Sequence, residues 1–154
     1  MSKLLVLLLA IVTVVTAADL PTRKWLNLEA IKTMVSAAET EAQKRNVQVT
    51  ICVVDENGNL LFLQKADNAG INTIQFAQKK ARDAAIYGRP SKDHADQLKN
   101  GNLQVLTLPD AFPNQGGVPI KADGRTIGAI ACSGAASEVD EAIAQAGLDA
   151  LMKK

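Results

Sequence analysis

The chain has 154 residues, of which 17 are basic and 16 acidic, and it contains only three Phe, one Tyr and one Trp. Charges of both signs are intermixed, so no basic patch predicts binding to nucleic acid, and the length fits one domain with a single core. Because aromatic residues are scarce, that core must be built mainly from Val, Ile, Leu and Ala.

The first segment is typical of an export signal. Lys3 is followed by an apolar stretch over residues 4–15 and then by small residues at 16–18, which is the order found in secretory signal peptides. As a helix the apolar stretch would be about 18 Å long, too short for a bilayer core of about 30 Å. We therefore predict a signal peptide over residues 1–18, one secreted or periplasmic domain over residues 19–154, and no membrane span after cleavage.

A helix followed by a hairpin is predicted next. Asn27 can cap a helix that continues to about residue 46, with apolar residues at helical spacing on one side. The β-branched segment 47–55 and the apolar segment 60–66 are separated by turn residues around Asn57 and Gly58. Such a short connection makes the two strands antiparallel.

The middle of the chain alternates helices with a long loop. Residues 72–87 carry an alanine-rich helical stripe, and a brief helix over residues 91–98 ends at Asn100 and Gly101. The Pro- and Gly-rich stretch that follows contains two short apolar pieces, around Val105 and Val118, that we predict as strands.

The last part predicts a central strand and a final helix. Residues 125–134 form a nearly continuous apolar strand whose Gly and Ala residues leave room for a neighbouring element, so we expect it in mid-sheet. Ser137 and Asp140 resemble a capping box that opens the final helix. Antiparallel strands separated by helices predict an α+β domain.

The two cysteines, Cys52 and Cys132, each lie in a strand-like apolar segment. Export makes a disulfide between neighbouring strands conceivable, and buried free thiols are the alternative. Two cysteines and one histidine are too few for a zinc site.

Gly116 and Gly117 are the first candidate ligand-binding residues, because paired glycines can expose backbone N–H groups to an anion or a carbonyl. A tight turn into a strand is the alternative interpretation. The segment lacks the lysine of a P-loop and the glycine spacing of a dinucleotide-binding motif. Lys80 and Arg82 can bind a carboxylate, although a solvated helix face would carry the same residues.

Ser133 and His94 complete the candidates. Ser133 ends a strand and can present its hydroxyl to a pocket, whereas no histidine is placed by sequence to activate it as a nucleophile. His94 is the only imidazole and is a candidate haem iron ligand, with Tyr87 or another oxygen ligand as the alternative. Its polar neighbours predict an exposed position for His94.

Four motifs occur in an order that resembles the GlcG/HbpS-like family: VVDENGNLL, FAQKKARDAAIYGRPS, PNQGGVPIKADGRTIGAIACSGAASEVD and AIAQAGLDAL. The resemblance covers nearly all of the chain after the leader. It implies a profilin-like antiparallel sheet of about five strands flanked by helices, and homo-oligomers that are often octameric. For some exported members it also implies binding or degradation of haem with a redox-sensing role, and a related domain accompanies cobalamin adenosyltransferases.

The sequence departs from that family in two places. The last strand ends in Ala131, Cys132, Ser133 and Gly134 where GVSG is common, and Asp83 replaces a small hydroxyl residue. Either change can alter a nearby pocket.

Three functional hypotheses follow. The first is an exported protein that binds haem or a related tetrapyrrole, with the glycine pair and the basic helix beside the ligand and a subunit interface completing the site. The second is an enzyme acting on a small acidic metabolite, with the Gly116 and Gly117 amides on an oxyanion and Lys80 or Arg82 on a carboxylate. The third is an oligomer with a structural or partner-binding role.

Overall fold

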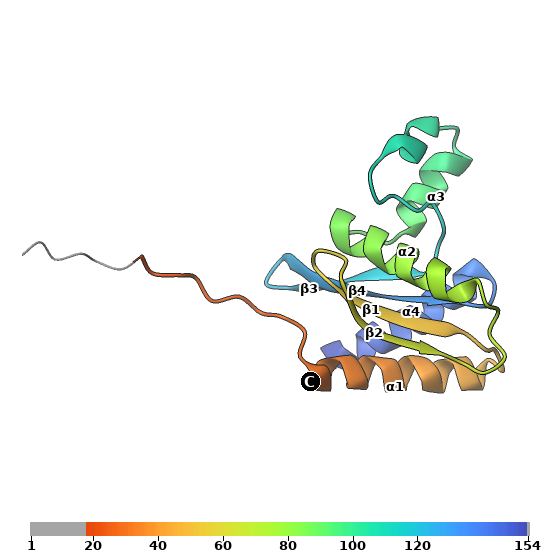
Figure 1. Cartoon of the computed structure of the whole chain (residues 1–154), viewed down its shortest axis with the longest axis horizontal. Helices are drawn as coiled ribbons and strands as arrows, with labels where there is room; N and C mark the ends of the chain where they lie inside the picture. The colour runs from red at the N-terminus through yellow and green to blue at the C-terminus, as the bar shows by residue number, and fades with distance from the viewer. Residues whose placement is uncertain (1–17, 154) are drawn as a thin grey trace, which may run out of the picture.

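The computed structural model describes residues 18–153, so the predicted signal peptide falls almost entirely outside the described residues (Figure 1). Four α-helices, one 3₁₀-helix and four strands follow one another in this part of the chain. Their order is α1 (Leu28–Lys44), β1 (Thr50–Asp55), β2 (Leu60–Lys65), α2 (Thr73–Tyr87), α3 (Lys92–Lys99), η1 (Leu103–Thr107), β3 (Gly117–Ala122), β4 (Arg125–Ser133) and α4 (Ser137–Met152).

The four strands form one antiparallel sheet in the order β2-β1-β4-β3. The prediction that residues 125–134 lie in mid-sheet is confirmed, because β4 pairs with β1 on one side and β3 on the other. The α+β class is confirmed as well, with four strands rather than about five. The strand expected around Val105 is wrong: that residue lies in η1, where it is buried between exposed Leu103 and Leu106.

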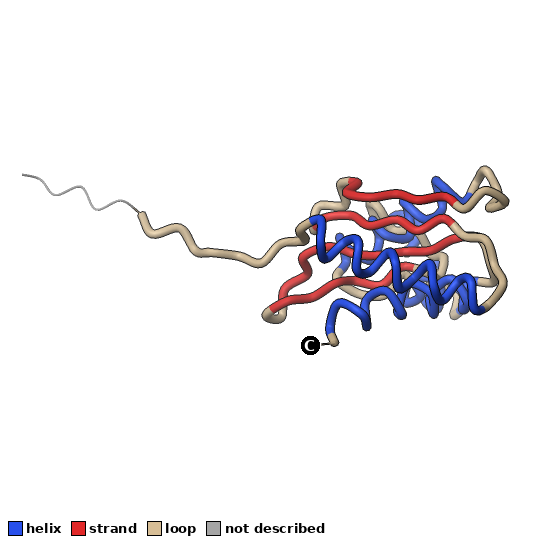
Figure 2. The backbone as a smooth tube through the Cα atoms, turned by 90° about the horizontal axis from the view of Figure 1, so that it is seen from below, coloured by secondary structure: helices blue, strands red, loops and turns tan. Residues whose placement is uncertain are grey.

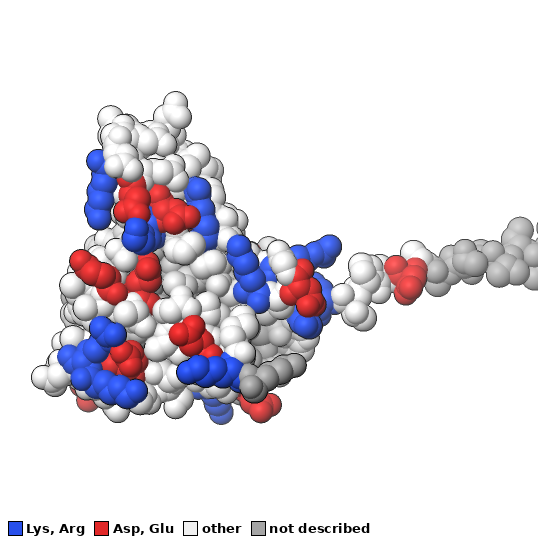
Figure 3. Space-filling view, turned by 180° about the vertical axis from the view of Figure 1, so that it is seen from behind, with Lys and Arg blue, Asp and Glu red and all other residues white. Residues whose placement is uncertain are grey.

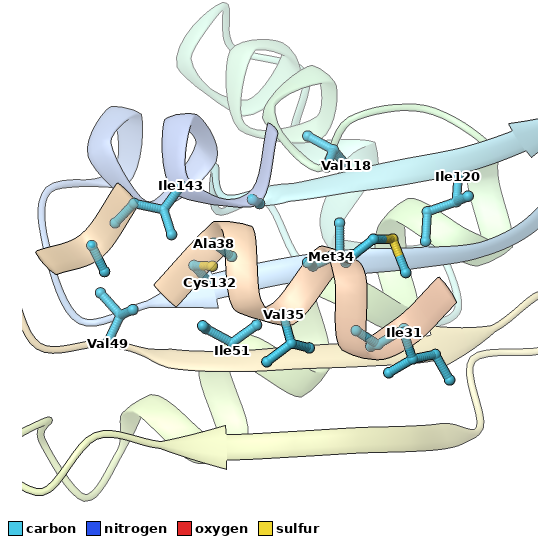
Figure 4. Packing of buried hydrophobic residues seen from close by; sticks show 14 of the residues in the cluster. Ile31, Met34, Val35, Ala38, Val49, Ile51, Val118, Ile120, Cys132 and Ile143 are labelled. Atoms are coloured by element: carbon cyan, nitrogen blue, oxygen red, sulfur yellow. The ribbon is translucent and has the colours of Figure 1, made fainter. Parts of the chain in front are cut away.

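Helices α1 and α4 cover one face of the sheet, as Figures 1 and 2 show. Asn27 caps α1 as predicted, since its side chain accepts a hydrogen bond from the Ala30 N–H at 2.8 Å. The core on this face combines branched residues with few aromatics (Figure 4): Ile31, Met34, Val35, Ala38, Val49, Ile51, Val118, Ile120, Cys132 and Ile143.

Helix α2 covers the opposite face through small side chains. Its buried residues Ala77, Ala81, Ala84 and Ala85 pack on Cys52, Val54, Ala129 and Ala131 of β1 and β4. Without larger side chains between them, helix and sheet approach closely, as the Gly and Ala residues of the strand over residues 125–134 predicted. This close packing brings the α2 backbone within reach of the β3 start.

Residues 88–116 form a lobe that contains α3 and η1 and projects beyond α2 (Figure 1). Gly88, in the left-handed region at φ +62°, ends α2 and turns the chain into this lobe. The lobe carries His94, so its attachment to α2 determines the surroundings of the only imidazole.

The start of α4 differs from the prediction. Ala136 is the N-cap and Ser137 is already helical, so Ser137 makes no capping hydrogen bond. Asp140 instead accepts a hydrogen bond from the Ala135 N–H at 2.9 Å through its first carboxylate oxygen. Its second oxygen is left to face the interior, where it binds Lys80.

Cys52 and Cys132 are both buried and free. In the β1–β4 register, Cys52 lies opposite Ala131 and Cys132 lies opposite Ile51. Because side chains alternate across a strand, the two thiols point to opposite faces of the sheet. The structure therefore has two buried free thiols, which was the alternative to a disulfide.

Positive and negative side chains alternate over the face shown in Figure 3, in keeping with the balanced composition. Within residues 18–153, none of the helices has both the length and the apolar character needed to cross a bilayer.

Candidate functional site

His94 is completely buried, which corrects the expectation of an exposed residue. It lies on α3, and the lobe folds back so that this helix packs its histidine against α2. Polar neighbours such as Lys92 and Asp96 form their own ion pair on the outer face of α3. The short helix thus separates a solvated face from a buried one, and the imidazole occupies the buried one.

Asp83 on α2 holds one side of the imidazole. Its carboxylate oxygens lie 3.0 Å and 2.9 Å from His94 Nδ1, and one of them accepts the Phe112 N–H at 2.6 Å. Burial raises the pKa of Asp83 above its ordinary value, although the hydrogen bonds from Phe112 and His94 act in the opposite direction. One carboxylate therefore ties both α3 and the loop after η1 to α2.

Arg89 holds the other side of the imidazole. Its Nη2 lies 2.6 Å from His94 Nε2. A guanidinium can only donate, so Nε2 accepts and the proton of the neutral ring is on Nδ1, which donates to Asp83. Tyr87 meets the ring edge-on at 4.5 Å between centroids, and the guanidinium lies over the Tyr87 ring. We call these four residues, Asp83, Tyr87, Arg89 and His94, the His94 cluster.

The His94 cluster has the form of a metal-ligating histidine with its supporting carboxylate. Histidines that bind metals commonly donate the other ring N–H to a carboxylate, which fixes the tautomer and raises the basicity of the ligand nitrogen. Here Nε2 is the ligand nitrogen, and Arg89 occupies its lone pair. Arg89 Nε is itself buried without a hydrogen-bond partner, so the guanidinium is incompletely satisfied in this position.

A haem iron requires only one such protein ligand, unlike a structural metal ion. Within residues 18–153, no group of three or more His, Cys, Asp or Glu side chains is placed to hold a metal ion. The His94 cluster therefore fits a haem iron in its donor chemistry, provided that Arg89 turns away from Nε2.

Lys80 occupies a different environment from the one predicted. Its side chain is 2% exposed, and its ammonium lies 2.8 Å from Asp140 Oδ2 and 3.2 Å from the Cys132 carbonyl oxygen. These contacts join α2 to β4 and α4 at one end of the sheet. In this structure the Lys80 charge is neutralised internally, and its role in ligand binding stays a prediction.

Gly116 and Gly117 do lie beside the basic helix, as expected. An ideal Cβ on Gly117 would lie 2.2 Å from the Lys80 carbonyl oxygen, and one on Gly116 would lie 2.8 Å from Lys80 Nζ. The Gly117 N–H donates to Ser91 Oγ at 2.9 Å. The glycines therefore permit close packing of the β3 start on α2, and no hollow separates the two elements; binding by their amides stays a prediction.

The remaining candidates are dispersed. Ser133 is buried at the end of β4, opposite Thr50 of β1. Arg82 binds Asp110 at 2.7 Å and donates to the Asn57 and Gly58 carbonyls, so it ties the β1–β2 turn to the lobe. Each of these residues has structural partners within its own chain.

The structure adds two residues that the sequence analysis did not select, Asp83 and Arg89. In the sequence Asp83 shows only a departure from the family pattern, and Arg89 carries no signal of its own. The helical spacing of Lys80 and Asp83 could have shown that both lie on the face of α2 that turns inward.

An antiparallel sheet with two helices on one face, a third on the other and a buried imidazole in an added lobe defines a small α+β domain. Residues 26–149 match the family described as haem degrading protein HbpS-like. The chain belongs to this HbpS-like family.

Three similar proteins illustrate the relationship. The protein GlcG of Escherichia coli K12 is 35% identical over 112 residues, which cover 73% of this chain and 84% of GlcG. The crystal structure of a double mutant of Streptomyces reticuli HbpS is 30% identical with a TM-score of 0.79, covering 91% of this chain and 96% of HbpS. A crystal structure of a PduOC:haem complex is 25% identical with a TM-score of 0.76, covering 82% and 95%.

Proposed function

We propose that this protein binds haem, with His94 Nε2 as the protein ligand to the iron. The observation that carries the proposal is the Nδ1 contact of His94 with the buried Asp83 carboxylate, because it leaves Nε2 as the ligand nitrogen. Membership of a family described as haem degrading, and the haem complex of PduOC, support the same ligand.

Arg89 controls access to the ligand nitrogen in this proposal. Its guanidinium must leave Nε2 before iron can approach, and it carries an unsatisfied buried N–H that favours departure. Bound haem would supply redox chemistry at its iron. Asp83 holds the His94 imidazole and fixes its tautomer.

The site lies between α2 and the lobe, and exposed apolar residues lie on the elements around it: Ile86, Leu103, Leu106 and Leu108. An apolar macrocycle needs such a surface, and a second copy of the chain can complete it. A homo-oligomer, a secreted or periplasmic location, and haem degradation or redox sensing remain parts of the proposal.

Titration of the purified chain with haemin tests haem binding. We expect a saturable shift of the Soret band, and its absence would remove the proposal. His94→Ala should abolish the ligand-dependent shift, and added imidazole should restore it by filling the vacated space. Arg89→Ala should strengthen binding, because Nε2 is then free.

Controls separate ligation from folding. Lys99→Ala changes an exposed residue at the end of the same helix and should bind haemin like the wild type. Circular dichroism should show that the His94→Ala protein is folded. A folded His94→Ala protein with an unchanged Soret spectrum would assign the iron to another ligand, such as Tyr87.

A further inference from the structure

A groove of about 540 Å³ lies at the other end of β4 from Lys80 and Ser133. It is formed where the segment before α1, the β3–β4 hairpin and the end of α4 meet, and Figures 1 and 2 show these three parts at the same end of the sheet. Its volume lies in the range of small-molecule sites. None of the candidates from the sequence analysis lines it.

The walls of the groove are apolar. Trp25 is 70% exposed and Met152 is 52% exposed, although both are large apolar side chains. Their neighbours in the lining are aliphatic: Leu26, Ala30, Ile120, Ala122, Ile127 and Leu151. Leaving a tryptophan in water beside an aliphatic groove is unfavourable, so a bound apolar body would be stabilised there.

All the charged residues that line the groove are basic, namely Arg23, Lys24 and Lys121. Arg23 and Lys24 have partners outside the lining, Glu56 at 2.7 Å and Asp123 at 3.1 Å, and both basic side chains are at least 65% exposed. Such surface pairs are weak and can be exchanged. Lys121 has no carboxylate within ion-pair distance among residues 18–153. Figure 3 shows basic and acidic side chains together where the N-terminal segment leaves the domain.

We propose that this groove binds a single-chain acyl carboxylate, with the chain along Trp25 and Ile127 and the carboxylate on Lys121. Apolar walls beside Lys121, which has no ion-pair partner among residues 18–153, with no acid in the lining, match a ligand that combines one alkyl chain with one negative head. None of the four residues of the His94 cluster lines this groove. The site is therefore separate from the His94 cluster and independent of haem binding.

Trp25 is the only tryptophan in the sequence, so its emission reports the groove directly. Titration with dodecanoate below its micellar concentration should give a saturable change in this emission. Dodecyltrimethylammonium, with the same chain and the opposite charge, should bind at least about tenfold more weakly, as expected for the loss of a charge-assisted contact. Equal binding of the two amphiphiles would overturn the proposal.

Two exposed substitutions test the residues. Lys121→Glu and Met152→Glu should each weaken dodecanoate binding about tenfold or more, while Lys99→Glu, an equal charge change on α3, should leave it unaltered. Lys121→Glu should also leave the haemin titration unchanged, and His94→Ala should leave dodecanoate binding unchanged. These two comparisons distinguish a failure of haem binding from a failure of dodecanoate binding in the groove.

If Trp25 responds to anionic phospholipid vesicles and not to dodecanoate, the groove is a membrane contact and the proposal is wrong.

Discussion

Lys80 and Asp140 form a buried ion pair, with 2.8 Å between Nζ and Oδ2 and with each side chain only 2% exposed. The pair connects the helix on one face of the sheet to the helix on the other. Lys80 Nζ also donates to the Cys132 carbonyl, and Asp140 also accepts the Ala135 N–H. Both charges are thus compensated in a place that water does not reach.

Removal of Lys80 should be strongly destabilising, because it leaves a buried carboxylate without its counter-charge. For Lys80→Met we expect a loss of about 3–5 kcal/mol in the free energy of unfolding, measured with chemical denaturant. Adding Asp140→Asn should restore part of this loss, since the uncompensated charge is then gone. The surface pair Glu41–Arg45 is the control, and breaking it should cost less than about 1 kcal/mol. A double variant no more stable than Lys80→Met would contradict this account.

Asp83 should give the stability of the protein a definite dependence on pH. Burial raises the pKa of its carboxyl above the ordinary 3.8 in the folded state, so the folded chain binds this proton more tightly than the unfolded chain. The contribution of Asp83 to stability is therefore fully present below pH 3.8 and is lost as the pH rises through the folded pKa. The stability of the wild type relative to Asp83→Asn should fall as the pH rises from 3.8 through the folded pKa of Asp83. A rise over this interval would contradict the assignment.

Asp55 should give the opposite dependence of stability on pH and therefore serves as an internal control. Its slight burial raises its pKa, but hydrogen bonds from Asn59 and Asn57, together with nearby Arg23, outweigh this effect and lower the pKa overall. The stability that Asp55 contributes to the β1–β2 turn is present above pH 3.8 and is lost as the pH falls through the lowered pKa. Relative to Asp55→Asn, the wild type should therefore lose stability on acidification.

The fold was largely predictable because its signals are local. The alanine stripe of α2, the turn at Asn57 and Gly58, and the small apolar residues of β4 each specify an element and the face it buries. Val105 was assigned wrongly because a short apolar run does not reveal whether a partner strand is available. In this fold β3 and β2 are the edges, and the residues around Val105 form a 3₁₀ turn that buries only that side chain.

The site was less predictable because its partners are distant in sequence. His94 lies among charged neighbours, and nothing within α3 indicates that Asp83, on another helix, will bury it. Lys80 looked like a surface cation because its counter-charge, Asp140, lies 60 residues later in a helix on the other face of the sheet. Pairings of this kind depend on the tertiary fold, which residue spacing does not encode.

The two thiols should resist oxidation in the native state. They point to opposite faces of the sheet, and burial raises the pKa of Cys52 to about 12 and that of Cys132 well above its ordinary value. We expect no disulfide after incubation with oxidised glutathione and no reaction with a thiol reagent at pH 8 until denaturant is added. Mass spectrometry checks both outcomes. An internal disulfide in the folded chain would mean that β1 and β4 pair in another register.

Gly117→Ala distinguishes the packing role of the glycine pair from a ligand-binding role. The added Cβ would lie 2.2 Å from the Lys80 carbonyl oxygen, and relief requires β3 to move away from α2. We expect a loss of about 3 kcal/mol or more, at the upper end for overpacked sites. Gly101→Ala is the control: its φ is +86° but no atom lies within 4 Å of the new Cβ, so only backbone strain of about 1–2 kcal/mol applies. If the two variants lose the same free energy of unfolding in denaturant, close packing on α2 is not the reason that position 117 requires glycine. If the Gly117→Ala protein instead keeps wild-type stability but no longer binds its ligand, the glycine amides belong to the binding site.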